Sequence, residues 1–361
     1  MIKSYKYRIY PTKEQEEKMK NFFGVARLIY NLGLQSKIYA YQSRKKLSTY
    51  DLIRQLTDMR KEFKFIKECP IDIQQQSLLN MEKAFSMFFK GKGFPKFKNK
   101  YSKQSIKFIQ HIHQEHNRIK LPKLGWIKAV TERNVYGKIK NATLSKTVTG
   151  KYYVSITFDT LIDIPNKVKI DESSSVGIDL GIKEYLITSD GEYVNNPKFL
   201  KTSLRKLRIE QRSLARKVKG SNNYHKQRIR VAKVNEHIRN QRMYFLHNLS
   251  TRLVKENDTL ILESLQVKNM VKNRKLSRTI SDAGWSMFVE MLKYKSEWFG
   301  KNLIQINTFF PSSKKCSVCG NVKKELKLSE RTYRCEVCGT ELDRDYNASL
   351  NIKQEGLLQA L

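Results

Sequence analysis

The sequence predicts a mixed α and β protein: an N-terminal β-barrel that carries a helical insert, followed by a C-terminal α/β domain that contains a zinc ribbon. Three observations lead to this prediction. The chain has 361 residues, enough for two or three domains with cores of their own. Strand patterns near the N-terminus give way to helical periodicity and then return, whereas strands and helices alternate after Ser175. Two Cys-x-x-Cys pairs lie close to the C-terminus.

The first strand and the first helix have clear local signals. Ile2–Tyr10 alternates in strand fashion with β-favouring residues until Pro11. Thr12 and Gln15 then match a capping box, which predicts that a helix begins here.

Helical periodicity continues in two further stretches, and β-rich runs follow them. The helical stretches are Tyr50–Lys67 and Gln74–Phe89, and residues 90–103 form a loop rich in Gly, Lys and Phe. From Ser105 to Asp159 short β-rich runs return, separated by turn signals. We therefore expect a barrel and an insert with these bounds: residues 1–11 and 105–160 for the barrel, residues 12–104 for the helical insert.

A second architecture begins after a linker at Leu161–Ser175, which holds a Pro, several charges and three serines. Val176–Leu180 and Glu184–Thr188 are predicted to pair as a hairpin, and a long basic helical hairpin is predicted to follow. Short apolar strands at Thr259–Leu262 and Leu303–Ile306 come later in the chain. We expect an α/β domain over residues 171–311 and 341–361, with the zinc ribbon at 312–340.

The charge of the chain points to a polyanionic partner. Lys and Arg number 70 against 34 Asp and Glu, which gives a formal net charge of +36. Such an excess repels itself unless it faces nucleic acid. Because the chain has no apolar run of about 18 residues and no signal-peptide pattern, we expect a soluble, intracellular protein in the cytoplasm.

The cysteine pattern predicts a zinc centre. Cys316 and Cys319 are separated from Cys335 and Cys338 by fifteen residues, and a Gly follows each pair. Four thiolates at this spacing can bind Zn²⁺ tetrahedrally, and a residue after each knuckle commonly needs the left-handed conformation that Gly adopts. The alternative is two redox pairs. The default role of such a zinc ion is structural, and Cys69 is expected to be a small core residue.

Acidic residues end two of the predicted buried strands. Asp179 lies in Val176–Gly181, and Glu263 follows Thr259–Leu262. After the ribbon, Asp343 is predicted to cap a helix and Asp345 to lie in its first turn. Converging carboxylates can bind Mg²⁺, and two ions about 4 Å apart would orient a water toward a phosphodiester. Taken singly, each acid could instead be a turn residue, an ion-pair partner or a charge that favours the helix dipole.

Motifs in family order along the whole chain resemble the TnpB family, the RNA-guided, RuvC-like nucleases encoded by insertion sequences, often labelled transposases and related to type V CRISPR effectors. The motifs are Tyr7-Arg-Ile-Tyr-Pro-Thr-Lys-Glu-Gln15, Gly93-Phe-Pro-Lys-Phe-Lys98, Gly177-Ile-Asp-Leu-Gly181, Ser281-Asp-Ala-Gly-Trp285, Phe310-Pro-Ser-Ser-Lys314 and Asp343-Arg-Asp-Tyr-Asn-Ala348.

The resemblance implies a role for several of these residues. It makes Asp179, Glu263 and Asp345 the metal-binding catalytic triad, favours Asp345 over Asp343, and places Arg331 near the scissile phosphate. It also implies a wedge-like barrel, a recognition insert and a RuvC/RNase H-like C-terminal domain. Glu263-Ser264-Leu265 departs from the usual Glu-Asp-Leu of relatives, which leaves Glu263 itself intact.

The resemblance also implies partners and a reaction. The partners would be a guide RNA from the transposon end and double-stranded target DNA, with one protein per RNA. The reaction would be Mg²⁺-dependent hydrolysis of DNA phosphodiesters, with two ions. Two rival functions use the same features: a guided DNA-binding repressor that does not cut, and a recombinase that joins strands.

Basic surfaces could bind these nucleic acids. The predicted helical hairpin carries many cations, among them Arg205, Arg208, Arg212 and Arg216, for which we expect contact with a guide–target duplex. Lys96 and Lys98 alternate with aromatic residues that could stack on unpaired bases. Those aromatic residues could equally anchor the loop.

Three histidines follow the loop. His111 and His113 would share one face of a strand, with His116 nearby. Metal ligation, RNA contact and plain surface positions are all compatible with this pattern.

Overall fold

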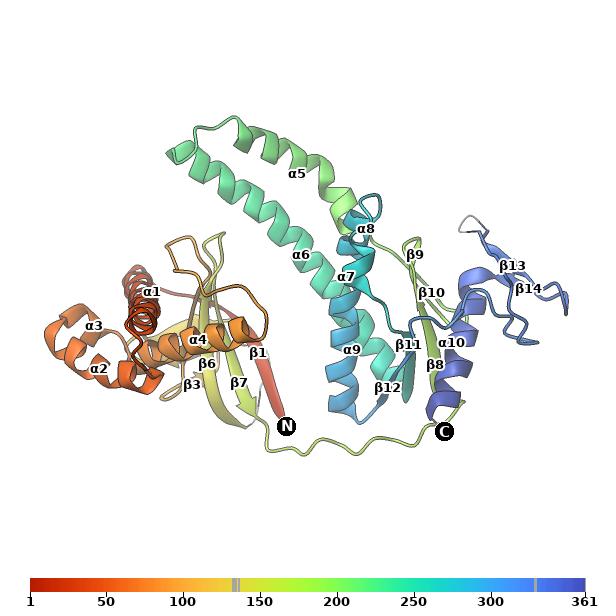
Figure 1. Ribbon diagram of the computed structural model, residues 1–361, viewed down its shortest axis with the longest axis horizontal. Coiled ribbons are helices and arrows are strands. Elements are labelled where there is room, and N and C mark those ends of the chain that lie inside the picture. The colour runs from red at the N-terminus through yellow and green to blue at the C-terminus, as the bar shows by residue number, and fades with distance from the viewer. Residues whose placement is uncertain (132–134, 136, 328–329, 361) are drawn as a thin grey trace. The chain divides into compact units, whose positions relative to one another are not determined.

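The computed structural model describes residues 1–131, 135, 137–327 and 330–360. The chain divides into two compact units, Met1–Ile162 and Asp163–Leu361 (Figure 1). No helix in the described part of the chain is both long and apolar enough to cross a membrane.

A seven-stranded sheet forms the β part of the first unit, in the order β2-β6-β7-β1-β5-β4-β3. The strands are β1 Ile2–Tyr10, β2 Gln104–Phe108, β3 His113–Glu115, β4 Arg118–Leu121, β5 Gly125–Ala129, β6 Lys138–Lys146 and β7 Tyr152–Asp159. The central strand β1 pairs antiparallel with β7 over eight positions, and only Ile9 and Tyr10 pair with β5.

The prediction of a β-barrel was wrong, because this sheet is open. Among the described residues the end strands β2 and β3 do not pair with each other, and each has one neighbour in the sheet. Strand β2 instead lies against the helices α1 and α4, and β3 is only three residues long. A barrel needs its first and last strands to pair in a consistent stagger, which a covered edge and a three-residue strand do not provide.

Four helices connect β1 to β2: α1 Lys13–Gln42, α2 Thr49–Glu62, α3 Lys64–Glu68 and α4 Ile71–Phe89. The predicted capping box is confirmed. The Gln15 N–H donates to Thr12 Oγ1 at 3.2 Å, and the Thr12 N–H donates to Gln15 Oε1 at 3.1 Å. Helices and sheet share one apolar core, which also contains Cys69. Burial raises the pKa of the Cys69 thiol to about 12, so this cysteine is an unreactive core residue.

The second unit is built on a five-stranded sheet in the order β10-β9-β8-β11-β12. Its strands are β8 Ser175–Leu180, β9 Glu184–Thr188, β10 Tyr193–Asn195, β11 Thr259–Glu263 and β12 Asn302–Ile306. The hairpin of β8 and β9 was predicted and is confirmed. Strands β8, β11 and β12 run parallel, so their carboxyl ends meet at one edge of the sheet.

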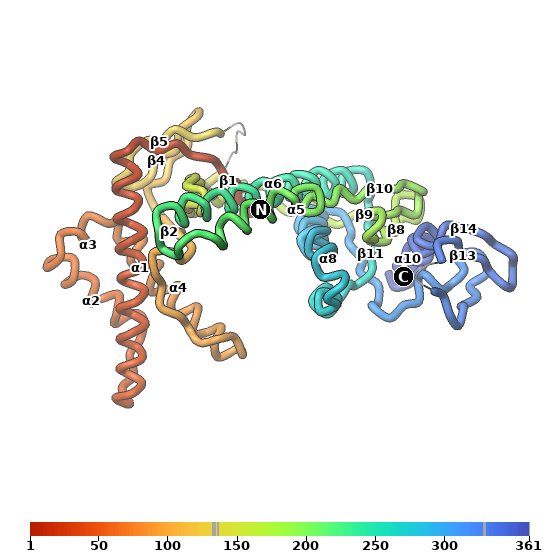
Figure 2. The backbone as a smooth tube through the Cα atoms, turned by 90° about the horizontal axis from the view of Figure 1, so that it is seen from above, coloured from red at the N-terminus to blue at the C-terminus, as the bar shows by residue number. Residues whose placement is uncertain are grey.

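Helices lie on both faces of this sheet (Figures 1 and 2). They are α5 Phe199–Ala215, α6 Asn222–Glu256, α7 Val267–Met270, α8 Ser277–Ala283, α9 Trp285–Phe299 and α10 Arg344–Ala360. Because side chains alternate along a strand, Leu260 and Leu262 join the core with α6 and α9. Ile261 faces the other way and packs with Ile352 of α10.

Two glycines bring α10 into direct contact with the sheet. A Cβ atom at Gly177 would lie 2.2 Å from the carbonyl oxygen of Ser349, and one at Gly356 would lie 2.2 Å from Ile261 Cγ2. Neither position has room for a side chain, so the helix backbone rests on β8 and β11. This contact sets where the first turn of α10 lies relative to the sheet.

Candidate functional site

A cluster of carboxylates lies where β8, β11 and α10 meet. Leu262 of β11 pairs with Ile178 of the parallel strand β8, so Glu263 and Asp179 are the next residue of each strand. Asp345 is in the first turn of α10. The structure thus brings together the three acids that the sequence singled out, from elements far apart along the chain.

Burial and mutual repulsion act on the two strand carboxylates. The pKa of Asp179 is raised to about 8, first by burial and then by the neighbouring charges of Glu263 and Asp345, while Arg344 opposes the shift. Burial also raises the pKa of Glu263, and a hydrogen bond from the Ser312 hydroxyl lowers it. Buried like charges destabilise the folded chain unless a cation compensates them.

Asp343 and Asp345 have different contacts and different roles in the structure. Asp343 Oδ1 accepts the backbone N–H groups of Asp345 and Tyr346, both at 3.0 Å, which confirms the prediction that Asp343 caps the helix. The Asp345 carboxylate instead faces two guanidinium groups, those of Arg344 at 2.7 Å and Arg331 at 3.4 Å. Its metal-binding role stays a prediction.

The donor set suits a hard divalent cation such as Mg²⁺, which prefers carboxylate oxygens. No residue in the described part of the chain donates a hydrogen bond to the Asp179 carboxylate, so its lone pairs are open to a cation. The three carboxylates do not form a set whose ligand atoms all lie within 4.8 Å of one another.

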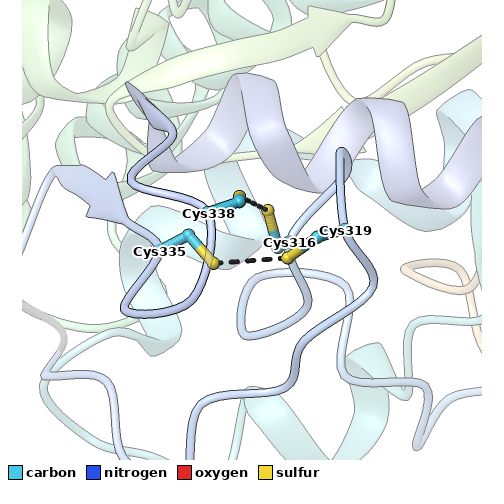
Figure 3. A group of neighbouring side chains, drawn as sticks. All are labelled: Cys316, Cys319, Cys335 and Cys338. Atoms are coloured by element: carbon cyan, nitrogen blue, oxygen red, sulfur yellow. Dashed lines mark hydrogen bonds between the residues drawn. The ribbon is translucent and has the colours of Figure 1, made fainter.

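Four cysteine sulfurs form a second centre, in the segment between β12 and α10 (Figure 3). Cys316, Cys319, Cys335 and Cys338 are, within the described ranges, the one group of potential ligands whose atoms all lie within 4.8 Å of one another. The Sγ atoms of Cys316 and Cys338 are 3.6 Å apart, and those of Cys319 and Cys335 are 3.5 Å apart. Zinc–sulfur bonds of about 2.3 Å in a tetrahedron separate the sulfurs by about 3.8 Å, so the group fits Zn²⁺.

The two cysteine turns have the same backbone construction. The N–H of Gly320 donates to the carbonyl oxygen of Cys316 at 3.0 Å, and the N–H of Gly339 donates to that of Cys335 at 3.1 Å. Gly320 has a φ of 77° and Gly339 a φ of 72°, which confirms the predicted left-handed glycines. Hydrogen bonds from Thr340 lower the pKa of Cys338 to about 6. A hydrogen bond from the Asn321 N–H lowers the pKa of Cys319, but contacts with the other three sulfurs raise it overall, so these thiols titrate as a group. Two short antiparallel strands, β13 Thr332–Arg334 and β14 Glu341–Asp343, flank the second cysteine pair, and β14 leads directly into α10.

One face of α5 is basic and free of acidic partners. Arg205, Arg208, Arg212 and Arg216 follow each other at intervals of three or four residues, so they share one face of the helix and its C-terminal cap. All four are exposed, and no acid in the described residues pairs with them. The opposite face carries Leu207, which is buried against Val234 and Ile238 of α6. Four unpaired guanidiniums along about 16 Å of helix fit a phosphate backbone. Their nucleic-acid role stays a prediction.

The predicted basic and aromatic loop is partly anchored. Phe94 packs edge-on against Phe85 and Phe88 of α4. The Lys98 ammonium lies 3.8 Å from the centre of the Tyr30 ring. Lys96 is exposed. Anchoring therefore accounts for Phe94 and Lys98, while contacts of Lys96 and Lys98 with nucleic acid stay predictions.

The expectation that two histidines share a strand face was wrong. His111 lies outside β3 with a φ of 55°, and only His113 is in the strand. His116 lies in the turn that follows. No histidine in the described ranges belongs to a group that could hold a metal.

Comparisons with known proteins agree with this arrangement. A family model described as "Probable transposase" matches residues 160–274, one described as "Cas12f1-like, TNB domain" matches residues 285–352, and one described as "Helix-turn-helix domain" matches residues 1–46. A Streptomyces pristinaespiralis protein named "Putative RNA-guided DNA endonuclease" is 37% identical over 98% of this chain and 89% of its own length. An Escherichia coli protein named "Putative RNA-guided DNA endonuclease InsQ" is 31% identical over 98% of this chain and 92% of its own length.

The chain belongs to the TnpB family. A solved structure titled as a Cas12f1–sgRNA–target DNA complex has the same fold, with a TM-score of 0.60 at 14% identity over 98% of both chains. In this TnpB-family chain the region matched as a helix-turn-helix domain contains β1 and one continuous helix of 30 residues, α1.

Sequence reasoning missed several polar residues beside the site of this TnpB-family chain. Ser312 touches Glu263, and Asn347 and Asn351 of α10 are completely buried. Ser312 lies inside a motif that the sequence had singled out, but its partner is 49 residues away, so no local pattern shows the contact.

Proposed function

We propose that the chain is an RNA-guided, Mg²⁺-dependent DNA endonuclease of an insertion sequence. The observation that carries this proposal is the Asp179 carboxylate, which is partly buried and desolvated beside two other acids and receives no hydrogen bond from any described residue. Membership of the TnpB family and relatives named as RNA-guided DNA endonucleases support the choice of reaction and substrate.

In this proposal Asp179, Glu263 and Asp345 hold the catalytic metal, most simply as two ions that share the acids. The metal would polarise the scissile phosphate and lower the pKa of the attacking water. Asp179 and Glu263 supply oxygens from the rigid ends of two parallel strands, and Asp345 completes the set from α10. Arg331, next to Asp345, would interact with the charge that develops on the phosphate.

The other parts of the chain take supporting roles. The first unit, with its open sheet over residues 1–11 and 105–160 and its helices within residues 12–104, would read a short DNA motif next to the target. Residues 171–311 and 341–361 would form a RuvC/RNase H-like nuclease domain, and residues 312–340 a structural zinc ribbon. Exposed arginines of α5, with Lys96 and Lys98, would contact a guide RNA from the transposon end and the target DNA. One protein would bind one RNA.

The test is cleavage by the protein purified with its copurifying RNA. Sequencing of that RNA defines the target, and linear DNA with the target sequence is incubated with Mg²⁺. We expect double-strand cleavage by the wild type and by Glu290→Ala, an exposed acid on α9, and none by Asp179→Ala. Binding without cleavage by both the wild type and Asp179→Ala would identify a repressor and overturn the proposal. Joined instead of hydrolysed ends would identify a recombinase.

A further inference from the structure

Ser312 bridges two elements of the acidic site. It lies between β12 and the first cysteine turn and is 5% exposed. Its hydroxyl donates a hydrogen bond to Glu263 Oε1 at the end of β11. Its carbonyl oxygen accepts from the side chain of Asn351, at 2.8 Å. The residue therefore contacts a carboxylate on the sheet and the helix that carries Asp345 at the same time.

Buried amides of α10 hold the whole segment around Ser312. Asn351 Nδ2 also donates to the carbonyl oxygen of Lys315 at 2.6 Å. One turn earlier, Asn347 Nδ2 donates to the same oxygen at 2.7 Å, and Asn347 Oδ1 accepts the N–H of Ser317 at 3.0 Å. Both asparagines are 0% exposed. Residues 312–317 are thus fixed to one face of α10 by side-chain hydrogen bonds.

The burial of the Asn351 amide costs free energy of folding, which indicates that the side chain has a function. Burying a primary amide destabilises the folded chain unless its polar atoms are paired. Asn351 Oδ1 is buried and has no hydrogen-bond partner in the described part of the chain, so the free-energy cost of burying this oxygen is not offset. An apolar side chain could cover the same surface, but it could not hold the carbonyl oxygen of Ser312.

We propose that Ser312 and Asn351 are positioning residues for the proposed cleavage reaction. Asn351 fixes the backbone of Ser312 against α10, and the Ser312 hydroxyl then fixes the rotation of the Glu263 carboxylate. Through this bridge the carboxylate on β11 keeps a constant place relative to Asp345. The inference rests on the proposed function, because it assigns these two residues a role in holding the metal ligands. Loss of hydrogen bonds that orient metal ligands typically costs 10–100-fold in metal affinity or activity.

The experiment compares five variants in the complex with the copurifying RNA. Ser312→Ala removes the donor, and Ser312→Thr keeps it. Asn351→Leu removes the amide while it keeps the volume. Ser349→Ala is the matched control, because this buried serine donates only to the carbonyl of Tyr346 in its own helix. Asp179→Ala measures the background of metal that binds outside the acidic site, mainly to the RNA.

Two measurements are made on each complex: the Mg²⁺ concentration that gives half-maximal cleavage, and Mn²⁺ binding followed by electron paramagnetic resonance. We expect Ser312→Ala and Asn351→Leu to raise the half-maximal Mg²⁺ concentration about tenfold and to weaken Mn²⁺ binding by a similar factor. Ser312→Thr and Ser349→Ala should stay within about twofold of the wild type.

Several outcomes would overturn the inference. One is a Ser312→Ala variant with the Mn²⁺ affinity of the wild type, and another is an equal loss in Ser312→Ala and Ser349→Ala, which would indicate general destabilisation. If Asn351→Leu does not fold, the comparison of Ser312→Ala with Ser312→Thr decides. A wild type that never cuts DNA would refute the proposed function. The positioning role would still be tested, because Mn²⁺ binding can be measured without cleavage.

Discussion

The guanidinium group of Arg331 lies 3.4 Å from the Asp345 carboxylate, on the oxygen that Arg344 does not contact. Asp345 therefore lies between two positive charges. Arg331 is half-exposed and Arg344 is nearly buried, so the Arg331 contact is the weaker and more easily exchanged one. A cation that binds Asp345 has to compete with Arg331, whose side chain would then be free to contact a phosphate.

Removal of Arg331 separates its two possible roles. If Arg331 contacts the scissile phosphate, Arg331→Ala lowers the single-turnover cleavage rate at saturating Mg²⁺ by about 100-fold. The loss of a competing cation should at the same time lower the Mg²⁺ concentration needed for half-maximal cleavage. Arg331→Lys keeps the charge and should recover part of the rate. An unchanged rate at saturating Mg²⁺ would make Arg331 merely an ion-pair partner.

Protonation of Asp179 should make the stability of the metal-free protein depend on pH. The folded-state pKa of about 8 lies above the ordinary aspartate value of 3.8, so the folded chain holds a proton that the unfolded chain releases. Stability from this group is fully present below about pH 4 and is lost as the pH rises to about 8. Asp179→Asn cannot ionise and should escape this loss. Thermal unfolding in chelator checks the difference: the variant should gain on the wild type between pH 5 and pH 8, and parallel curves would contradict it.

The contact of α10 with the sheet predicts that replacing either of two glycines destabilises the folded chain. At Gly177 an added Cβ meets the backbone oxygen of Ser349, whereas at Gly356 it meets the movable side chain of Ile261. We expect Gly356→Ala to lower the free energy of unfolding by about 1–3 kcal/mol, and Gly177→Ala to lower it by more. Gly93→Ala is the control, because nothing lies within 4 Å of its Cβ position. Urea unfolding measures all three, and equal values for Gly177→Ala and Gly93→Ala would refute the close packing.

Zinc content tests the cysteine centre. Cys316→Ser or Cys335→Ser should remove one equivalent of zinc from the purified protein, because tetrahedral binding needs all four thiolates. Cys69→Ala, which alters a buried cysteine in the core of the first unit, should retain the full amount. Plasma mass spectrometry gives the ratio of zinc to protein. A wild type without zinc that forms disulfides between the pairs would favour the redox alternative.

The arginine face of α5 predicts salt-dependent binding. Arg208→Ala and Arg212→Ala should each weaken RNA binding and reduce the slope of log K against log salt by about 1, the expected effect of one lost phosphate contact. Arg118, which already pairs with Glu115 at 2.7 Å, provides the control variant Arg118→Ala. Filter binding at several KCl concentrations measures the slopes. Unchanged slopes for both α5 variants would remove this helix from the binding surface.

Local signals in the sequence predicted local structure well. The capping box at Thr12 and the cap at Asp343 each involve residues within three positions of one another, and both formed as predicted. The sequence also singled out Asp179 and Glu263, because a charge at the end of an apolar strand calls for an explanation wherever the strand lies, whereas Asp345 was chosen over Asp343 through the family resemblance. That they meet in space follows from the parallel register of β8 and β11, which no short pattern contains.

Features that depend on distant partners were wrong or missing. Alternating β-rich runs indicate strands, but they do not tell whether the last strand returns to the first, and the predicted barrel is an open sheet. The alternation around His111 predicted a strand where the chain turns. In the sequence, Asn347 and Asn351 look like ordinary polar residues of a helix. Only the structure shows that they bind residues 312–317.

The order of synthesis determines which parts of the acidic site an incomplete chain contains. Asp179 and Glu263 are synthesised well before α10, which supplies Asp345 and covers Ile261 and Ile306. A product of premature termination before Arg344 therefore keeps two of the three acids and leaves that apolar surface open to water. On the proposed assignment such a fragment is unable to cut, and its uncovered surface makes it a substrate for cellular proteases.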